Sequence, residues 1–379
     1  MRTKSLSFEP LSQHLHRFQV GKPTPFGIFD VTGRLLLARG HTFEHERQLS
    51  RLVDRDATVD MREVDDTVRK IASARHDQLP SFWDESMNAI GRVLRASPGA
   101  DFTKSLDVAA RILTALVERD PDLAILQVVC GENGANNSMY SSRHAVHTAT
   151  AACLAARRLG WSEEMGNSVL RVALTMNISM TELQNRLSNQ VTAVTPMQRA
   201  EITSHPERSA KMLELVGVKD KDWLDSVRQH HEIDSGTGYP LGLTKVNEVA
   251  QLIQCADSFT AKLSHRGLRT PLLADKAARL QFQSSKGSVM TAALIKEFGL
   301  YPPGCAVRLK SGEVGLVMRR GDGVNTPIVA VVTDCHGDSL LTPRSRDSSK
   351  PGLGIVAVIP MSGLKVRFGL EKLINSAPE

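Results

Sequence analysis

The chain has 379 residues, of which 41% are hydrophobic and 23% charged, so it can bury a sizeable core in two or three domains. It contains no apolar run near the roughly 18 residues that cross a bilayer and no secretory signal, so we expect a cytoplasmic protein without membrane contacts. The net charge of +6 favours an anionic ligand, but aromatic residues make up only 4% of the chain, and we expect no DNA or RNA partner.

The N-terminal part of the chain is predicted to form a small mixed module. Residues 26–43 contain two apolar runs on either side of "DVTG", a composition that is typical of a hairpin turn. The segment "HERQLSRLVD" that follows has apolar residues at helical spacing. We therefore expect an α+β module over residues 1–65.

The middle of the chain has a helical pattern. Between residues 66 and 300, apolar residues recur every three or four positions, and Gly and Pro are concentrated at the breaks. This spacing predicts a domain of roughly eight or more helices, with its core at about residues 140–270.

The pattern changes again after "LYPPG". The stretches "CAVRLKSGEVGLVMRR", "TPIVAVVTD" and "GIVAVIPM" are rich in β-branched residues and are separated by turns, which predicts a small β domain over residues 301–379. We expect "RSRDSSKPG" to be an exposed loop. The predicted fold class is mainly α, a helical bundle between a small N-terminal α+β module and a small C-terminal β domain.

Histidines are concentrated in the helical region. Asp257 lies in "QLIQCADSFTAKL", an apolar helix in which an unpaired carboxylate would be costly to bury. Imidazoles near a carboxylate can bind a divalent ion, although a local packing role is the alternative for any one histidine. The histidines of this region are His144, His147, His205, His230, His231 and His265.

The run "HHEIDSGTGYP", followed by "VAQLIQCADSFTAKLSHRGLR", resembles the HD-GYP subgroup of the HD-domain phosphohydrolases. These are bacterial enzymes that hydrolyse cyclic di-GMP at a binuclear or trinuclear metal centre. The resemblance covers about residues 140–269 and implies an HD-type helical bundle that binds divalent iron or manganese. The metal ligands that it implies are His144, His205, His230, His231 and Asp257.

The resemblance also implies a nucleotide pocket. Tyr239, Arg266 and Arg269 match positions that line this pocket or contact the phosphates in the family. For the two arginines, an exposed position in solvent is the alternative.

The resemblance fails at the adjacent His and Asp that name the HD superfamily, because Met176 and Asn177 occupy these positions. A carboxamide cannot bridge two ions as an anion, and a thioether suits iron or manganese poorly. Tyr140 replaces a Glu of trinuclear members, and Ser235 and Thr260 replace Asp residues. We expect at most one ion, on His205, His230 and His231, with a metal-free protein as the alternative.

These substitutions predict a protein of cyclic-di-GMP signalling that has little or no phosphodiesterase activity and acts by binding the nucleotide or a protein partner. One alternative is an active metal-dependent phosphodiesterase with a remodelled site, in which Asn177 ligates a metal and a carboxylate such as Glu232 assists. Another alternative is a ligand-free scaffold that recruits a diguanylate cyclase or another regulator.

Overall fold

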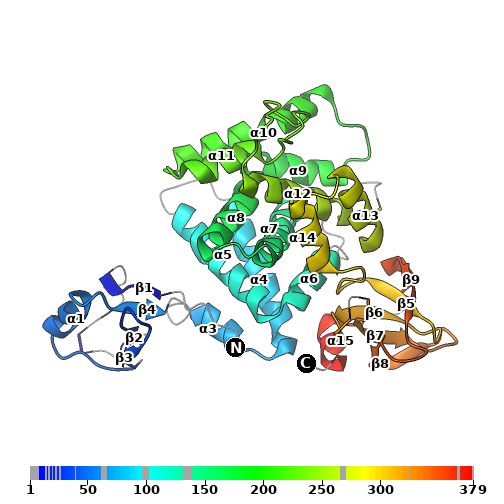
Figure 1. Ribbon diagram of the computed structural model, residues 1–379, viewed down its shortest axis with the longest axis horizontal. Helices are drawn as coiled ribbons and strands as arrows, with labels where there is room; N and C mark the ends of the chain where they lie inside the picture. Colours follow the sequence, from blue (N-terminus) through cyan, green and yellow to red (C-terminus); the bar gives the residue numbers. More distant parts are fainter. Residues whose placement is uncertain are drawn as a thin grey trace. The chain divides into compact units, whose positions relative to one another are not determined.

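The computed structural model describes residues 8–12, 15, 18, 20–21, 24, 27–38, 40–60, 66–95, 102–130, 139–264, 270–323, 325–364 and 368–377. The chain divides into two compact units, Met1–Ala74 and Arg75–Glu379 (Figure 1). Among the described residues, no helix combines the length and apolarity that a membrane crossing requires.

The first unit contains a four-stranded antiparallel sheet with the strand order β1-β4-β2-β3. The predicted hairpin is present, since β2 pairs with β3 in antiparallel orientation. The Asp30 carboxylate stabilises the turn between them by accepting hydrogen bonds from the backbone N–H groups of Thr32 and Arg34, each at 2.9 Å. The elements of this unit are β1 (Phe8–Pro10), β2 (Ile28–Phe29), β3 (Leu35–Leu37), α1 (Glu46–Val53), β4 (Thr58–Asp60) and α3 (Asp66–Ser73).

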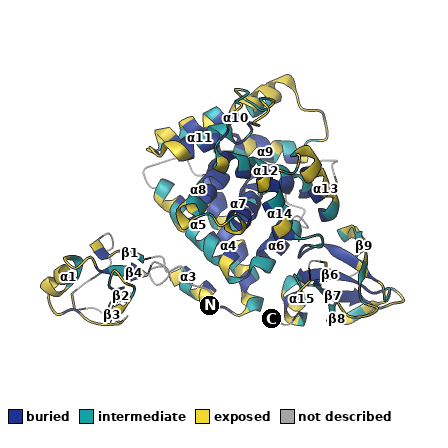
Figure 2. Ribbon diagram, viewed as in Figure 1, coloured by how far each residue is buried: buried dark blue, intermediate teal, exposed yellow. Residues whose placement is uncertain are grey.

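The second unit begins with a helical bundle around α7 (Tyr140–Arg158). This helix carries no charged residue between 144 and 156, and it is buried on all sides (Figure 2). The other bundle elements are η2 (His76–Gln78), α4 (Leu79–Arg95), α5 (Phe102–Arg119), α6 (Pro121–Cys130), α8 (Glu163–Thr175), η4 (Ile178–Met180), α9 (Thr181–Asn189), α10 (Pro196–Leu215), α11 (Lys221–Gln229), α12 (Glu248–Leu263), α13 (Ala274–Ser284) and α14 (Val289–Phe298).

Side-chain caps fix where the three helices that carry the candidate site begin. Thr195 precedes α10, Asp220 precedes α11 and Asn247 precedes α12. In each case the side-chain oxygen accepts a hydrogen bond from a backbone N–H three residues later, which satisfies a group that the first helical turn leaves unpaired. The caps therefore set the position of each site residue along its helix.

The C-terminal part of the second unit is an antiparallel sheet with the strand order β8-β7-β6-β5-β9. Arg320, directly after β6, forms ion pairs with Asp122 of α6 and Glu297 of α14, which tie the sheet to the bundle. The elements are β5 (Ala306–Leu309), β6 (Val314–Arg319), β7 (Ile328–Thr333), β8 (Ser339–Asp347), β9 (Ile355–Ile359), η5 (Met361–Gly363) and α15 (Leu370–Ser376).

The predicted fold class is confirmed, with a small mixed module before the helical bundle and a small β domain after it. The expected loop at "RSRDSSKPG" is wrong in part, since Arg344 to Asp347 belong to the edge strand β8 and pair with β7. Polar side chains are compatible with an edge strand because one side of it faces solvent. The boundaries at residues 65 and 300 stay predictions.

Candidate metal centre

Three histidines from two helices converge in the bundle. His205 lies in α10, whereas His230 and His231 directly follow α11. The Nε2 atoms of His205 and His230 are 3.0 Å apart, and one ligand atom from each of the three rings lies within 4.8 Å of the others. In the part of the chain that the structure describes, this is the one cluster of three or more such side chains with metal-binding geometry.

Backbone carbonyls fix the tautomers of two of these rings. Nδ1 of His205 is 2.5 Å from the carbonyl oxygen of Ile202, and Nδ1 of His230 is 2.6 Å from that of Val227. A carbonyl oxygen only accepts, so each Nδ1 must carry the proton, and in the neutral ring each Nε2 presents a lone pair. The sequence leaves the Ile202 carbonyl free to accept from His205. Pro206, four residues after Ile202, has no N–H and cannot donate the usual helical hydrogen bond to this carbonyl.

The facing lone pairs of His205 and His230 suit a cation. Two nitrogen ligands about 2.1 Å from one ion, and at right angles to each other, are about 3 Å apart. Burial, and then the nearby His231, lower the pKa of His205 to about 3 and that of His230 well below its usual range. The rings are therefore neutral near pH 7, as metal ligation requires, and the donor set fits a divalent ion.

His144 of α7 and Asp257 of α12 form a second polar pair beside this cluster. His144 Nε2 is 2.6 Å from Asp257 Oδ1. Burial alone would raise the pKa of Asp257, but the hydrogen bond with His144 and the nearby rings of His231 and His230 hold it well below its usual range. Asp257 is therefore an anion in the folded protein.

Met176 and Asn177 lie at the end of α8, where neither contributes an imidazole or a charge. Met176 is fully buried and Asn177 is 8% exposed. The Oδ1 atom of Asn177 is buried without a hydrogen-bond partner among the described residues. The His144–Asp257 pair thus offers one anion and one imidazole, and the end of α8 offers a neutral oxygen.

The glycine-rich turn after His231 is built around Glu232. Its two carboxylate oxygens accept hydrogen bonds from the backbone N–H groups of Leu241, at 2.7 Å, and Leu243, at 2.9 Å. Both oxygens thereby take part in holding the turn. The ring of Tyr239 stacks on that of His231, with centroids 4.5 Å apart, so the turn also contacts this histidine of the cluster.

The structure brings most of the predicted site residues together. The three-histidine cluster, the His144–Asp257 pair and Tyr239 share one region, in which Asp257 influences the pKa of His231 and Tyr239. Arg266 and Arg269 lie outside the described residues. The hydroxyl of Thr260 is 3.0 Å from that of Thr148, so this position joins α12 to α7.

Comparisons with known proteins agree with this architecture. A family model described as an HD domain matches residues 133–288. Over 209 residues, the chain is 26% identical to the cyclic di-GMP phosphodiesterase PA4108 of Pseudomonas aeruginosa. The aligned region covers 54% of this chain and 47% of the relative. The solved structure of Bd1817, a HDG"Y"P protein from Bdellovibrio bacteriovorus, has the same fold, with a TM-score of 0.50, 18% identity, and coverage of 73% of this chain and 95% of that one.

Residues 133–288 match the HD-domain family, and the two similar proteins support the resemblance to its HD-GYP subgroup. The chain spans about half the length of the curated relative that it matches, at 47%. The role of each candidate metal ligand, and the effect of Met176 and Asn177, stay predictions.

The HD-GYP turn requires glycine at position 238. A Cβ atom there would lie 2.5 Å from both Glu232 Cα and Ile233 N, and 2.6 Å from His231 O, which are all backbone atoms. We expect Gly238→Ala to lower the free energy of unfolding by about 1–3 kcal/mol, because the turn must move. The control is Gly166→Ala in α8, where the added methyl meets nothing within 4 Å. Urea unfolding checks this, and equal stabilities for the two variants would contradict it.

The buried histidines make the stability of the metal-free protein depend on pH. Burial, followed by the charges of Arg143 and His144, lowers the pKa of His147 to about 3 from the usual 6.5. Between these values the unfolded chain binds a proton that the folded chain does not, so stability is present above pH 6.5 and is lost as the pH falls. From pH 7 to pH 5 the loss is about 2 kcal/mol for each such histidine.

We therefore expect His147→Gln to reduce the pH dependence of stability. Between pH 7 and pH 5, its free energy of unfolding should fall by about 2 kcal/mol less than that of the wild type. Urea unfolding in EDTA at both pH values measures the difference. An identical fall in the two proteins would show that His147 is protonated equally in the folded and unfolded states.

Proposed function

We propose that this chain is a cyclic-di-GMP-responsive HD-GYP protein that holds at most one divalent ion and has little or no phosphodiesterase activity. The observation that carries the proposal is the asymmetry of the site. Three histidines converge on one side, at His205, His230 and His231. The His144–Asp257 pair offers one anion, and the position that holds an Asp in the resembling family is the neutral Asn177.

The three-histidine side is suited to one ion. Its rings are neutral, and the Ile202 and Val227 carbonyls orient two of them with Nε2 facing the cluster. A dication bound there would supply a Lewis acid that attracts a phosphate oxygen. Iron or manganese is the expected metal from the family resemblance.

The opposite side is poorly suited to a second ion. Paired-metal hydrolysis of a phosphodiester requires both ions to share an oxygen, with a bridging anion between them. Asn177 is neutral and Met176 offers a soft sulfur, so Asp257 is the one anion described there against four positive charges. Without the paired centre, transition-state stabilisation worth several powers of ten in rate is lost.

Cyclic di-GMP as the ligand is supported by the curated relative, which is a cyclic di-GMP phosphodiesterase. The half-buried ring of Tyr239 beside His231 offers an aromatic face at the edge of the cluster. The basic character of the chain, at +6, suits a ligand with two phosphates. By the resemblance, Arg266 and Arg269 would contact these phosphates.

An active phosphodiesterase with a remodelled site is the second candidate. The observation in its favour is the buried Asn177 Oδ1, which has no hydrogen-bond partner among the described residues and could ligate an ion. It would have to do so without Glu232, whose oxygens are held by the turn.

The test restores the missing groups by Met176→His together with Asn177→Asp. The wild type should bind at most about one Mn²⁺ per chain and hydrolyse cyclic di-GMP no faster than a variant with His230→Ala and His231→Ala. The restored protein should bind a second ion and gain several powers of ten in rate. The matched control, Met165→His with Asn167→Asp, makes the same changes at the other end of α8 and should resemble the wild type.

Other outcomes separate the candidates. Turnover by the wild type that His231→Ala abolishes would establish the remodelled phosphodiesterase. Failure of calorimetry to detect cyclic di-GMP binding, together with capture of a diguanylate cyclase, would favour the scaffold.

A further inference from the structure

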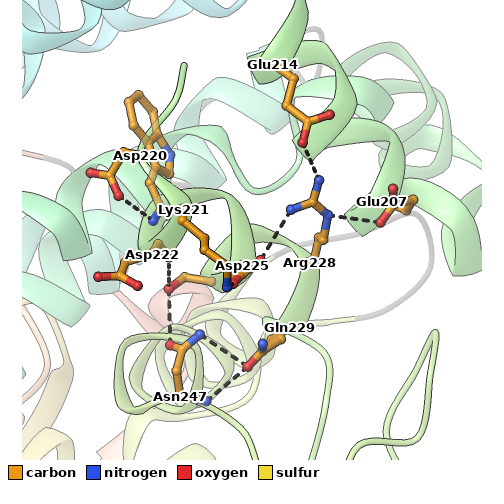
Figure 3. A network of polar contacts seen from close by, with 11 residues as sticks. Glu207, Glu214, Asp220, Lys221, Asp222, Asp225, Arg228, Gln229 and Asn247 are labelled. Carbon is orange, nitrogen blue, oxygen red and sulfur yellow. Dashed lines mark hydrogen bonds and ion pairs between the residues drawn. The ribbon is translucent and has the colours of Figure 1, made fainter. Parts of the chain in front are cut away.

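The last turn of α11 links two neighbouring helices immediately before the histidine pair. Arg228 lies two residues before His230 and contacts α10, the helix of His205 (Figure 3). Gln229 lies one residue before His230 and contacts the start of α12, the helix of Asp257. Consecutive residues of one turn therefore hold the helices that carry the candidate ligands.

Arg228 is held by three carboxylates. Its Nε donates to Glu207 at 3.1 Å, one Nη donates to Glu214 at 2.6 Å, and the other donates to Asp225 at 3.3 Å. The arginine side chain is 25% exposed, while Glu207 and Glu214 are 43% and 45% exposed, so the contribution of these contacts comes from their shared geometry more than from burial. The planar guanidinium spans all three partners at once, which a single ammonium group cannot do.

The carboxylates on α10 are placed to receive this arginine. Glu207 and Glu214 are seven residues apart, which puts them on the same face of the helix two turns from each other. Glu207 is also only two residues beyond His205. The Arg228 contacts therefore fix both the distance and the rotation of α10 against α11 close to the histidine cluster.

Gln229 forms the second link. Its Oε1 accepts hydrogen bonds from the backbone N–H of Asn247 at 3.0 Å and from the Asn247 side-chain amide at 3.2 Å. Asn247 is the residue that caps α12 through a 2.8 Å bond from the N–H of Ala250. This contact fixes the start of the helix that presents Asp257 to the site.

The histidine cluster needs such a restraint. In the tautomers that the Ile202 and Val227 carbonyls impose, the lone pairs of His205 and His230 face each other at 3.0 Å and repel. Unrestrained helices would separate to relieve this repulsion in the metal-free protein. We infer that Arg228 and Gln229 are positioning residues that hold the histidine cluster in its metal-binding arrangement before an ion binds. The part of this inference that concerns metal affinity rests on the proposed function.

The first experiment titrates Co²⁺ into the EDTA-treated full chain and follows visible absorption. We expect Arg228→Met to weaken Co²⁺ binding about 10- to 100-fold, as loss of a group that orients metal ligands does. Arg228→Lys should recover part of the affinity, because it keeps the positive charge but lacks the planar guanidinium that contacts three carboxylates at once. Equal affinity of Arg228→Met and the wild type would overturn the inference.

The matched control is Arg346→Met in the C-terminal sheet. Arg346 is 27% exposed and makes a forked ion pair with Glu313, much as Arg228 does with its partners. Its removal should leave Co²⁺ affinity unchanged. If this variant weakens binding as much as Arg228→Met, the effect is a general loss of stability, and the positioning role is wrong.

A second measurement does not depend on metal. Nitrogen-15 NMR of histidine-labelled protein in EDTA should show His205 and His230 of the wild type as fixed Nδ1–H tautomers, and tautomer exchange in Arg228→Met. Unchanged ring signals would contradict positioning while leaving the proposed function intact. Absence of Co²⁺ binding by the wild type would overturn the metal-affinity part of the inference while remaining compatible with a chain that holds at most one ion, and the ring signals would still decide the role of Arg228.

Discussion

The candidate site depends on the hydrogen bonds from His205 and His230 to backbone carbonyls within their own helical segments. Each bond places the proton on Nδ1 and leaves Nε2 with a lone pair, and the two lone pairs are 3.0 Å apart in a fully buried position. This arrangement is unfavourable by itself and favourable around a cation. The caps of α10 and α11 fix where these helices begin, and Arg228 contacts α10 from the end of α11, which is the basis of the inference that it helps to maintain this arrangement.

The distribution of charge explains why the two sides of the site differ. The three-histidine side is neutral and can accept a dication without losing an ion pair. On the other side, His144 already engages the anion of Asp257 at 2.6 Å, and Asn177 adds no charge. Because paired-metal hydrolysis needs both sides to act together, the change at Met176 and Asn177 is the basis of our proposal that this chain binds the nucleotide without hydrolysing it.

Much of the fold follows from sequence periodicity. The 3.6-residue spacing predicted the bundle, β-branched runs predicted the C-terminal strands, and "DVTG" predicted the first hairpin. Residue type placed six histidines in the helical region, and the resemblance to the HD-GYP subgroup identified the three among them that converge. The polar strand β8 was missed because its composition is that of a loop and its pairing with β7 is long-range. The contacts of Arg228 with Glu207 and of Gln229 with Asn247 depend on how helices pack, which local spacing does not encode. The residue types at Asn247 and Pro206 are the local features of the sequence that bear on these helices.

The most direct test of the account is a count of metal ions by anomalous diffraction from crystals of the native chain grown with excess Mn²⁺. The account predicts one strong peak, within ligation distance of His205, His230 and His231, and no second peak against Asn177 and Asp257. Two fully occupied peaks sharing a bridging oxygen would contradict it.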